Sequence, residues 1–137
     1  MPQGAVVLYG CLMGYGGRVI ASHDLGSRLV ENGDQLSSAL ESILEFVERT
    51  SPTTPATRFE ALDHGPIRVL VDKGIHSMLI LIIEGQEDEA LRQRMRQILQ
   101  GFEGRYATDL AEGDLGRRLR RDGRDAIATA ANLTKVF

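Results

Sequence analysis

The sequence is poor in cysteine and has no long hydrophobic run. The single cysteine, Cys11, excludes an intramolecular disulfide, so nothing points to an oxidising compartment. The longest apolar run, MLILII at residues 78–83, is far shorter than the roughly 20 residues that a bilayer-spanning helix needs. The opening segment, MPQGAVVLYG, lacks the basic stretch of a secretory signal. We therefore expect a soluble cytoplasmic protein with no membrane insertion.

The chain also lacks a strong charge of either sign. It carries 16 basic and 19 acidic residues, a formal net charge of −3, and its pI is about 5.6. This mild balance gives no reason to expect a nucleic-acid partner. With 137 residues, 42% of them hydrophobic, the chain is long enough for one core. We assign residues 1–106 to a main domain and 107–137 to a C-terminal helical extension, either packed on that domain or reaching outward.

The first half of the sequence predicts a hairpin followed by a helix. Residues 5–13, AVVLYGCLM, are typical of a buried strand, and residues 17–22, GRVIAS, are its expected partner. A helix is predicted to begin after Asp34, which can cap it. Its apolar positions recur at helical spacing: Leu36, Leu40, Ile43 and Val47, with Leu44 and Phe46 widening the apolar arc.

The second half predicts three strands and then helices. The strands are expected at residues 58–62, 67–72 and 75–84. The last of them is apolar on both faces, so both faces should be covered. A helix is predicted after Gly85, with a stripe formed by Leu91, Met95, Ile98, Leu99, Phe102 and Tyr106, and a further helix from about Arg124.

These elements give an α+β fold in the order β-β-α-β-β-β-α with a C-terminal helix. We expect a five-stranded, mainly antiparallel sheet with helices on both faces. The two most apolar strands, residues 5–13 and 75–84, should be central. The segments GRVIAS and RFEAL (residues 58–62) should form the two edges.

The element order resembles the longin and roadblock (dynein light-chain) modules, which share a profilin-like arrangement. The resemblance covers roughly residues 5–106 and rests on VVLYGCLMGYGGRVIAS, DQLSSALESILEFV and the three later strands. It implies a non-enzymatic module that dimerises or serves small Ras-like GTPases. PAS-like and GAF-like sensor modules use a similar five-stranded sheet with other helix placements, so a small-molecule sensing module is the alternative.

The glycines of MGYGGRVIASHD, residues 13–24, raise the question of a phosphate-binding loop. That loop requires a following Lys-Ser/Thr pair and the start of a helix, whereas an apolar strand follows here. Gly16 and Gly17 are the residues that a tight hairpin turn requires. The segment therefore predicts a turn and not a nucleotide site.

No set of residues in the sequence indicates catalysis or metal binding. His23, His64 and His76 have no metal-ligand spacing, and zinc would need about four ligands brought together. Cys11 and His76 could form a nucleophilic pair across neighbouring strands, but a free cysteine in an apolar strand is more often a small buried hydrophobe. We therefore expect no enzyme, no cofactor and no metal.

Two groups of residues are candidates for partner binding. The edge strand and the extended arc of the first helix are expected to form a homodimer interface made of Arg58, Phe59, Glu60, Leu62, Leu44 and Phe46. The dense cluster GRRLRRDGRD offers contacts to an acidic partner through Arg117, Arg118, Arg120 and Arg121. The simpler interpretation of that cluster is a solvated helix face, balanced by Asp114, Asp122 and Asp125.

The expected function is therefore an interaction or scaffold module, self-associating and binding a small GTPase or a larger assembly. Under the sensing alternative, a small molecule would lie between sheet and helix. Tyr9, His76 and Ser77 are the polar groups of the central strands that could line such a cavity.

Overall fold

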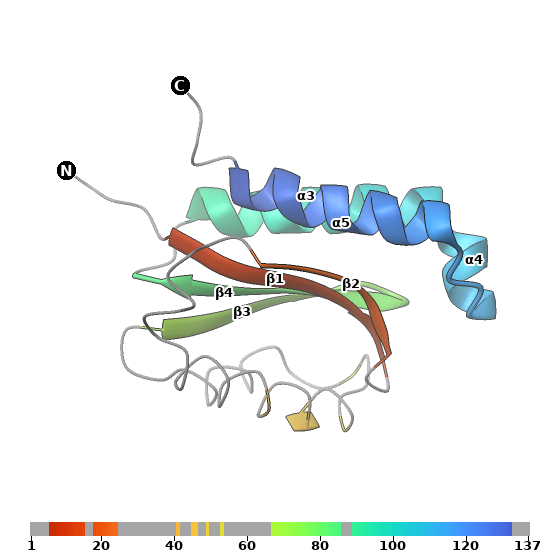
Figure 1. Cartoon of the computed structure of the whole chain (residues 1–137), viewed down its shortest axis with the longest axis horizontal. Helices are drawn as coiled ribbons and strands as arrows, with labels where there is room; N and C mark the ends of the chain where they lie inside the picture. The colour runs from red at the N-terminus through yellow and green to blue at the C-terminus, as the bar shows by residue number, and fades with distance from the viewer. Residues whose placement is uncertain are drawn as a thin grey trace.

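A single antiparallel sheet carries two long helices on one face (Figure 1). The computed structural model describes residues 6–15, 18–24, 67–85 and 89–132, with positions 41, 45, 46, 49 and 53 between them. The strands are β1 (Val6–Gly14), β2 (Val19–Asp24), β3 (Ile67–Lys73) and β4 (Ser77–Glu84). The helices are α3 (Glu89–Arg105), α4 (Ala107–Glu112) and α5 (Arg117–Asn132).

The four described strands run in the order β2-β1-β4-β3, and every neighbouring pair is antiparallel. This confirms the central positions predicted for the first and last strands, and it places β2 at one edge. The predicted hairpin is also confirmed, because β1 pairs with β2 and the amide of Gly14 donates to the carbonyl of Arg18 at 2.7 Å. The fifth strand, predicted at residues 58–62, lies outside the described residues.

Strand β4 is buried on both of its faces, as its sequence predicts. Leu79, Leu81 and Ile83 join the core cluster beneath the helices. Met78, Ile80 and Ile82 point to the opposite face and belong to a second cluster. All six side chains are at most 1% exposed. The sheet is therefore covered on both sides along its central strand.

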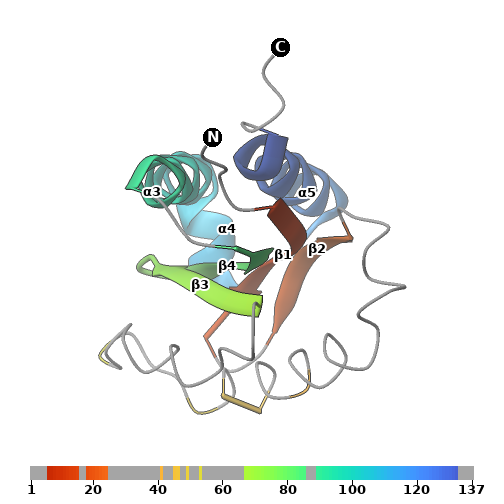
Figure 2. The same ribbon diagram turned by 90° about the vertical axis from the view of Figure 1, so that its left-hand side faces the viewer.

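The two long helices divide the sheet between them. Helix α3 packs on β3 and β4, and α5 packs on β1 and β2, so that the helices lie side by side over one face (Figure 2). The prediction of helices on both faces of the sheet is thus confirmed for one face, the face that α3 and α5 cover. The predicted helix after Asp34 lies largely outside the described residues, although Phe46 is partly buried against the second cluster.

Helix α5 begins earlier than the sequence predicts, at Arg117 instead of about Arg124. Its first turns bring Leu119, only 2% exposed, into the core, and Ile127 and Ala130 are fully buried further along. The arginine cluster is therefore the polar face of an amphipathic helix. Residues after 106 supply part of the same core as β1 and β4.

Two glycines allow α5 to approach the sheet closely. A Cβ added to Gly10 of β1 would clash with Cγ2 of Ile127 and lie 3.0 Å from Cδ2 of Leu81. On the helix, a Cβ at Gly123 would lie 3.3 Å from atoms of Ala21 and Leu12. The close contact between helix and sheet thus depends on a glycine in each of the two surfaces, Gly10 in β1 and Gly123 in α5.

The variant Gly10→Ala should lower the free energy of unfolding by about 1–3 kcal/mol, because the added methyl overpacks the contact with Ile127. Gly101→Ala is the matched control. Its Cβ meets nothing within 4 Å, so removing a helical glycine should raise stability by about 0.5–1 kcal/mol. Chemical denaturation of the three proteins measures both changes. A Gly10→Ala variant as stable as the wild type would contradict the close packing.

A chain ending at residue 106 should fail to unfold cooperatively, because it loses Leu119, Ile127 and Ala130 and exposes β1 and β2. Thermal melts followed by circular dichroism test this. A sharp transition near that of the full chain would show that residues 107–137 are dispensable for the core.

Candidate functional site

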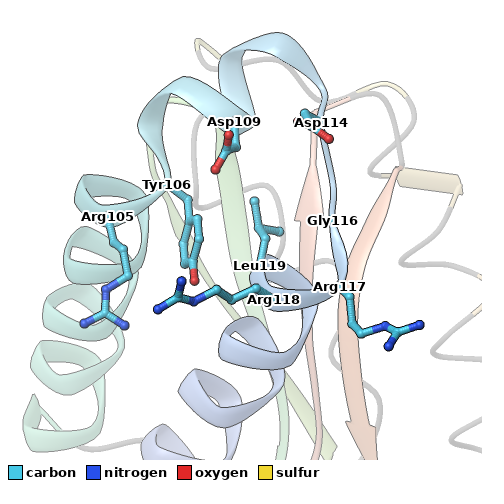
Figure 3. A pocket seen from close by; sticks show the side chains of 8 residues that line it. All are labelled: Arg105, Tyr106, Asp109, Asp114, Gly116, Arg117, Arg118 and Leu119. Atoms are coloured by element: carbon cyan, nitrogen blue, oxygen red, sulfur yellow. The ribbon is translucent and has the colours of Figure 1, made fainter.

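An open cleft lies where α3, α4 and α5 meet (Figure 3). Its volume is about 710 Å³. Arg105 is the last residue of α3, Tyr106 joins α3 to α4, and Arg117 and Arg118 begin α5. We call this site the arginine cleft; its lining comprises Arg105, Tyr106, Asp109, Asp114, Gly116, Arg117, Arg118 and Leu119.

One wall of the arginine cleft is fixed by a carboxylate, Asp122 of α5. The hydroxyl of Tyr106 donates a short hydrogen bond to Oδ2 of Asp122, and Nη1 of Arg105 lies 3.5 Å from the same oxygen. The hydrogen bond from Tyr106 lowers the pKa of Asp122, and the charges of Arg121, Arg105 and Arg118 lower it further. The same hydrogen bond raises the pKa of Tyr106. At neutral pH the pair is therefore an ionised carboxylate held by a protonated phenol.

Arg117 and Arg118 are exposed, and Arg118 acts on Asp122 through its charge without touching it. Among the residues that the structure describes, neither guanidinium makes a hydrogen bond or an ion pair. Figure 3 shows the Arg118 side chain extending toward Tyr106 and Arg105, whereas Arg117 points away from them. The first turn of α5 contains no acidic residue, although the helix dipole favours negative charge there. Positive charge thus gathers at this end of α5, where Asp109 and Asp114 line the same cleft without forming an ion pair with Arg117 or Arg118.

The local balance expected for the arginine cluster is only partly observed. Of the three aspartates expected to neutralise it, Asp122 contacts Arg105 and also Arg121, whose Nε lies 3.9 Å from Oδ1. Within the described residues, Asp114 and Asp125 form no ion pair with the cluster. Direct contact therefore pairs Arg121 with an aspartate, whereas Arg118 acts on Asp122 only at longer range and Arg117 makes no ion pair within the described residues.

Arg120 has a structural role. Its Nε donates to the carbonyl of Leu115 at 3.1 Å, and its Nη1 lies 3.3 Å from the carbonyls of both Val19 and Ile20. Arg18, the residue before β2, makes a similar contact, with Nη1 3.3 Å from the carbonyl of Gly113. These two arginines tie the loop before α5 to the edge strand.

The residues proposed for self-association are mostly outside the described part of the chain. This applies to Arg58, Phe59, Glu60 and Leu62, and to Leu44. Phe46 is partly buried against the second core cluster, so part of its ring already packs inside the molecule. The homodimer interface stays a prediction.

A buried carboxylate, Glu103 of α3, holds the turn between β3 and β4. It accepts hydrogen bonds from the amides of Ile75 (2.9 Å) and His76 (2.8 Å) and from the hydroxyl of Ser77 (2.7 Å). This role could not be predicted from the sequence, in which the only signal is an acidic side chain four positions after Leu99. Ser77, considered there for a ligand cavity, donates its hydroxyl to Glu103 instead.

The nucleophilic pair considered for Cys11 and His76 is not assembled. Cys11 lies opposite Ile80, and His76 is four residues further back, about 13 Å along a strand. Burial raises the pKa of the Cys11 thiol to about 12, so it is protonated at neutral pH. In the described part of the chain, no three histidine, cysteine or acidic residues are grouped to hold a metal. The described helices include none with the length and apolar character to cross a membrane.

No protein-family model matches the chain, and no curated protein matches its sequence.

The variant Glu103→Gln should lower the free energy of unfolding by about 1–3 kcal/mol. Its side-chain NH2 group replaces one carboxylate oxygen and cannot accept the hydrogen bond that this oxygen accepts in the wild type. Glu112→Gln removes an exposed carboxylate from the neighbouring helix and is the control, with a change below about 0.5 kcal/mol. Equal stabilities for both variants, measured by denaturant titration, would contradict the role given to Glu103.

Proposed function

We propose that this protein is a non-enzymatic interaction module that binds an acidic segment of a partner protein at the arginine cleft. The observation that carries the proposal is that Arg117 and Arg118, both exposed and without a hydrogen bond or ion pair among the described residues, line an open cleft. Arginine presents a planar set of donors that matches a carboxylate in two places at once. A partner's aspartate or glutamate would form the ion pairs that these two guanidinium groups do not make within the described residues.

The distribution of charge along the sequence supports an acidic partner. Residues 89–132, which contain the three helices, hold nine arginines, seven acidic residues and no lysine. The remainder of the chain holds seven basic and twelve acidic residues. The helical layer is thus positive in a chain that is negative overall, so an acidic ligand is attracted to that layer more than to the rest.

The resemblance of the element order to longin and roadblock modules supports the same class of function. It implies a module that self-associates or serves a small Ras-like GTPase, and we propose both as partners of this chain. The central position of β1 and β4 and the antiparallel pairing are consistent with that resemblance. In this proposal the arginine cleft contributes the electrostatic part of partner recognition.

A fluorescein-labelled peptide of alternating glutamate and glycine tests the cleft by fluorescence anisotropy. The double variant Arg117→Ala/Arg118→Ala should weaken binding by about two- to fivefold for each arginine removed. Raising the ionic strength should weaken binding to the wild type as well.

The control is Arg68→Ala/Arg124→Ala, which removes the same charge from two exposed arginines outside the cleft. It should bind within about twofold of the wild type at low salt. Equal losses of affinity for the two double variants would show that binding depends only on the net charge of the protein. Unchanged affinity for both would show that the peptide does not bind at the arginine cleft.

A further inference from the structure

We infer that Arg120 of α5 guards the outer edge of β2 and prevents a second copy of this chain from adding a strand there. The proposed function does not use this contact between helix and sheet, so the inference goes beyond it and is tested separately. Three observations lead to it: an edge strand without protection of its own, a bulge in that strand, and an arginine placed over the carbonyls at the bulge.

Strand β2 has the properties of an edge that another strand can join. It is the outermost of the described strands on its side of the sheet, and among them it pairs with β1 alone. Natural sheets commonly block such an edge with lysine or proline in the strand itself. The sequence of β2, VIASHD, contains neither. Val19 is apolar and 39% exposed, so the start of the strand also offers an apolar contact.

The pairing pattern shows which backbone groups of β2 face outward. Alternate residues of an antiparallel strand bond to one neighbour and then to the other. Gly14 of β1 donates to Arg18, so Leu12 of β1 also bonds toward β2 and its partner Ala21 bonds inward. Ser22, the next residue, therefore turns its amide and carbonyl away from β1, and its side chain is exposed.

A bulge interrupts the ladder between β1 and β2. Leu12 pairs with Ala21 and Met13 pairs with Val19, so Ile20 has no residue opposite it. A bulge disturbs the regular spacing of the outward groups, and it is one of the devices by which natural sheets discourage strand addition. It acts at the start of β2, where the exposed apolar side chain lies.

Arg120 covers the carbonyls at this bulge. Its Nη1 lies 3.3 Å from the carbonyl oxygens of both Val19 and Ile20. Helix α5 lies over β1 and β2 (Figure 2), and Nε of Arg120 donates to the carbonyl of Leu115 at 3.1 Å, so the guanidinium is held from both sides. A strand that joined β2 here would have to displace a charged donor, whose hydrogen bonds are stronger than those between neutral groups.

A second copy of this chain is the strand donor that the guard excludes. Two β2 strands can pair antiparallel across a twofold axis, so each copy supplies both an open edge and the strand that would join it. This donor is present wherever the protein is, at the same concentration. Without Arg120, the two sheets would become one continuous sheet.

The test compares the full wild-type chain with Arg120→Ala and with Arg120→Met, which keeps the aliphatic stem and loses the donors. Light scattering at equal protein concentration should give both variants a mean mass about twice that of the wild type or more, because their β2 edges pair. Hydrogen exchange followed by mass spectrometry should show residues 19–23 gaining protection as the concentration of either variant rises. The same residues of the wild type should exchange at a rate that does not depend on concentration.

Arg18→Ala is the matched control. Arg18 also ties the loop before α5 to the sheet, through the carbonyl of Gly113, but among the described residues it covers no carbonyl of β2. This variant should keep the wild-type mass. The inference is overturned by a wild-type mass for both Arg120 variants, by an equal increase in mass for Arg18→Ala, or by association that leaves residues 19–23 unprotected.

Discussion

The structure depends on the burial of β4 on both of its faces. A strand with apolar side chains at every position cannot leave either face in water, so the chain has to place material above and below it. Leu79, Leu81 and Ile83 draw α3 and α5 onto one face, and Met78, Ile80 and Ile82 form the base of the other cluster. The order β2-β1-β4-β3 follows from this constraint, because the two most apolar strands occupy the centre.

The position of α5 connects this packing to the proposed binding surface. Its apolar side contributes Leu119, Ile127 and Ala130 to the core, and its polar side carries the arginines. Close contact at Gly10 and Gly123 sets the height of the helix above the sheet. Arg120 fixes its start to the carbonyls of β2. The guanidinium groups beside the cleft are therefore carried by a helix whose position the core determines.

Much of the fold could be predicted from the sequence, because hydrophobic periodicity is a local signal. The hairpin of β1 and β2, the central position of β4 and the extent of α3 all follow from patterns within a few residues. The start of α5 could not be predicted in this way. Its first two turns carry Leu119 as their one apolar residue among charged residues and a glycine, and Gly123 packs close to Ala21 and Leu12 of the sheet, which are distant in sequence.

The candidate site shows the same division. The arginine cluster is visible in the sequence, but the sequence does not show which of its arginines hold the fold together and which are exposed beside the cleft. Arg120 bonds to residues about 100 positions earlier, and Arg105 joins the cleft only because α4 turns the chain back. Glu103 is a similar case, since its three donors lie in a turn more than 25 residues away. Such contacts between distant segments leave no local pattern to read.

Because one helix supplies both the core and the cleft, binding at the proposed site would be thermodynamically linked to folding. An unfolded chain does not bring Arg105 and Arg118 together, so any ligand of the cleft binds the native state alone and shifts the folding equilibrium toward it. The linkage also works in reverse: a substitution deep under α5 reduces the fraction of molecules able to bind, although it touches no residue of the surface.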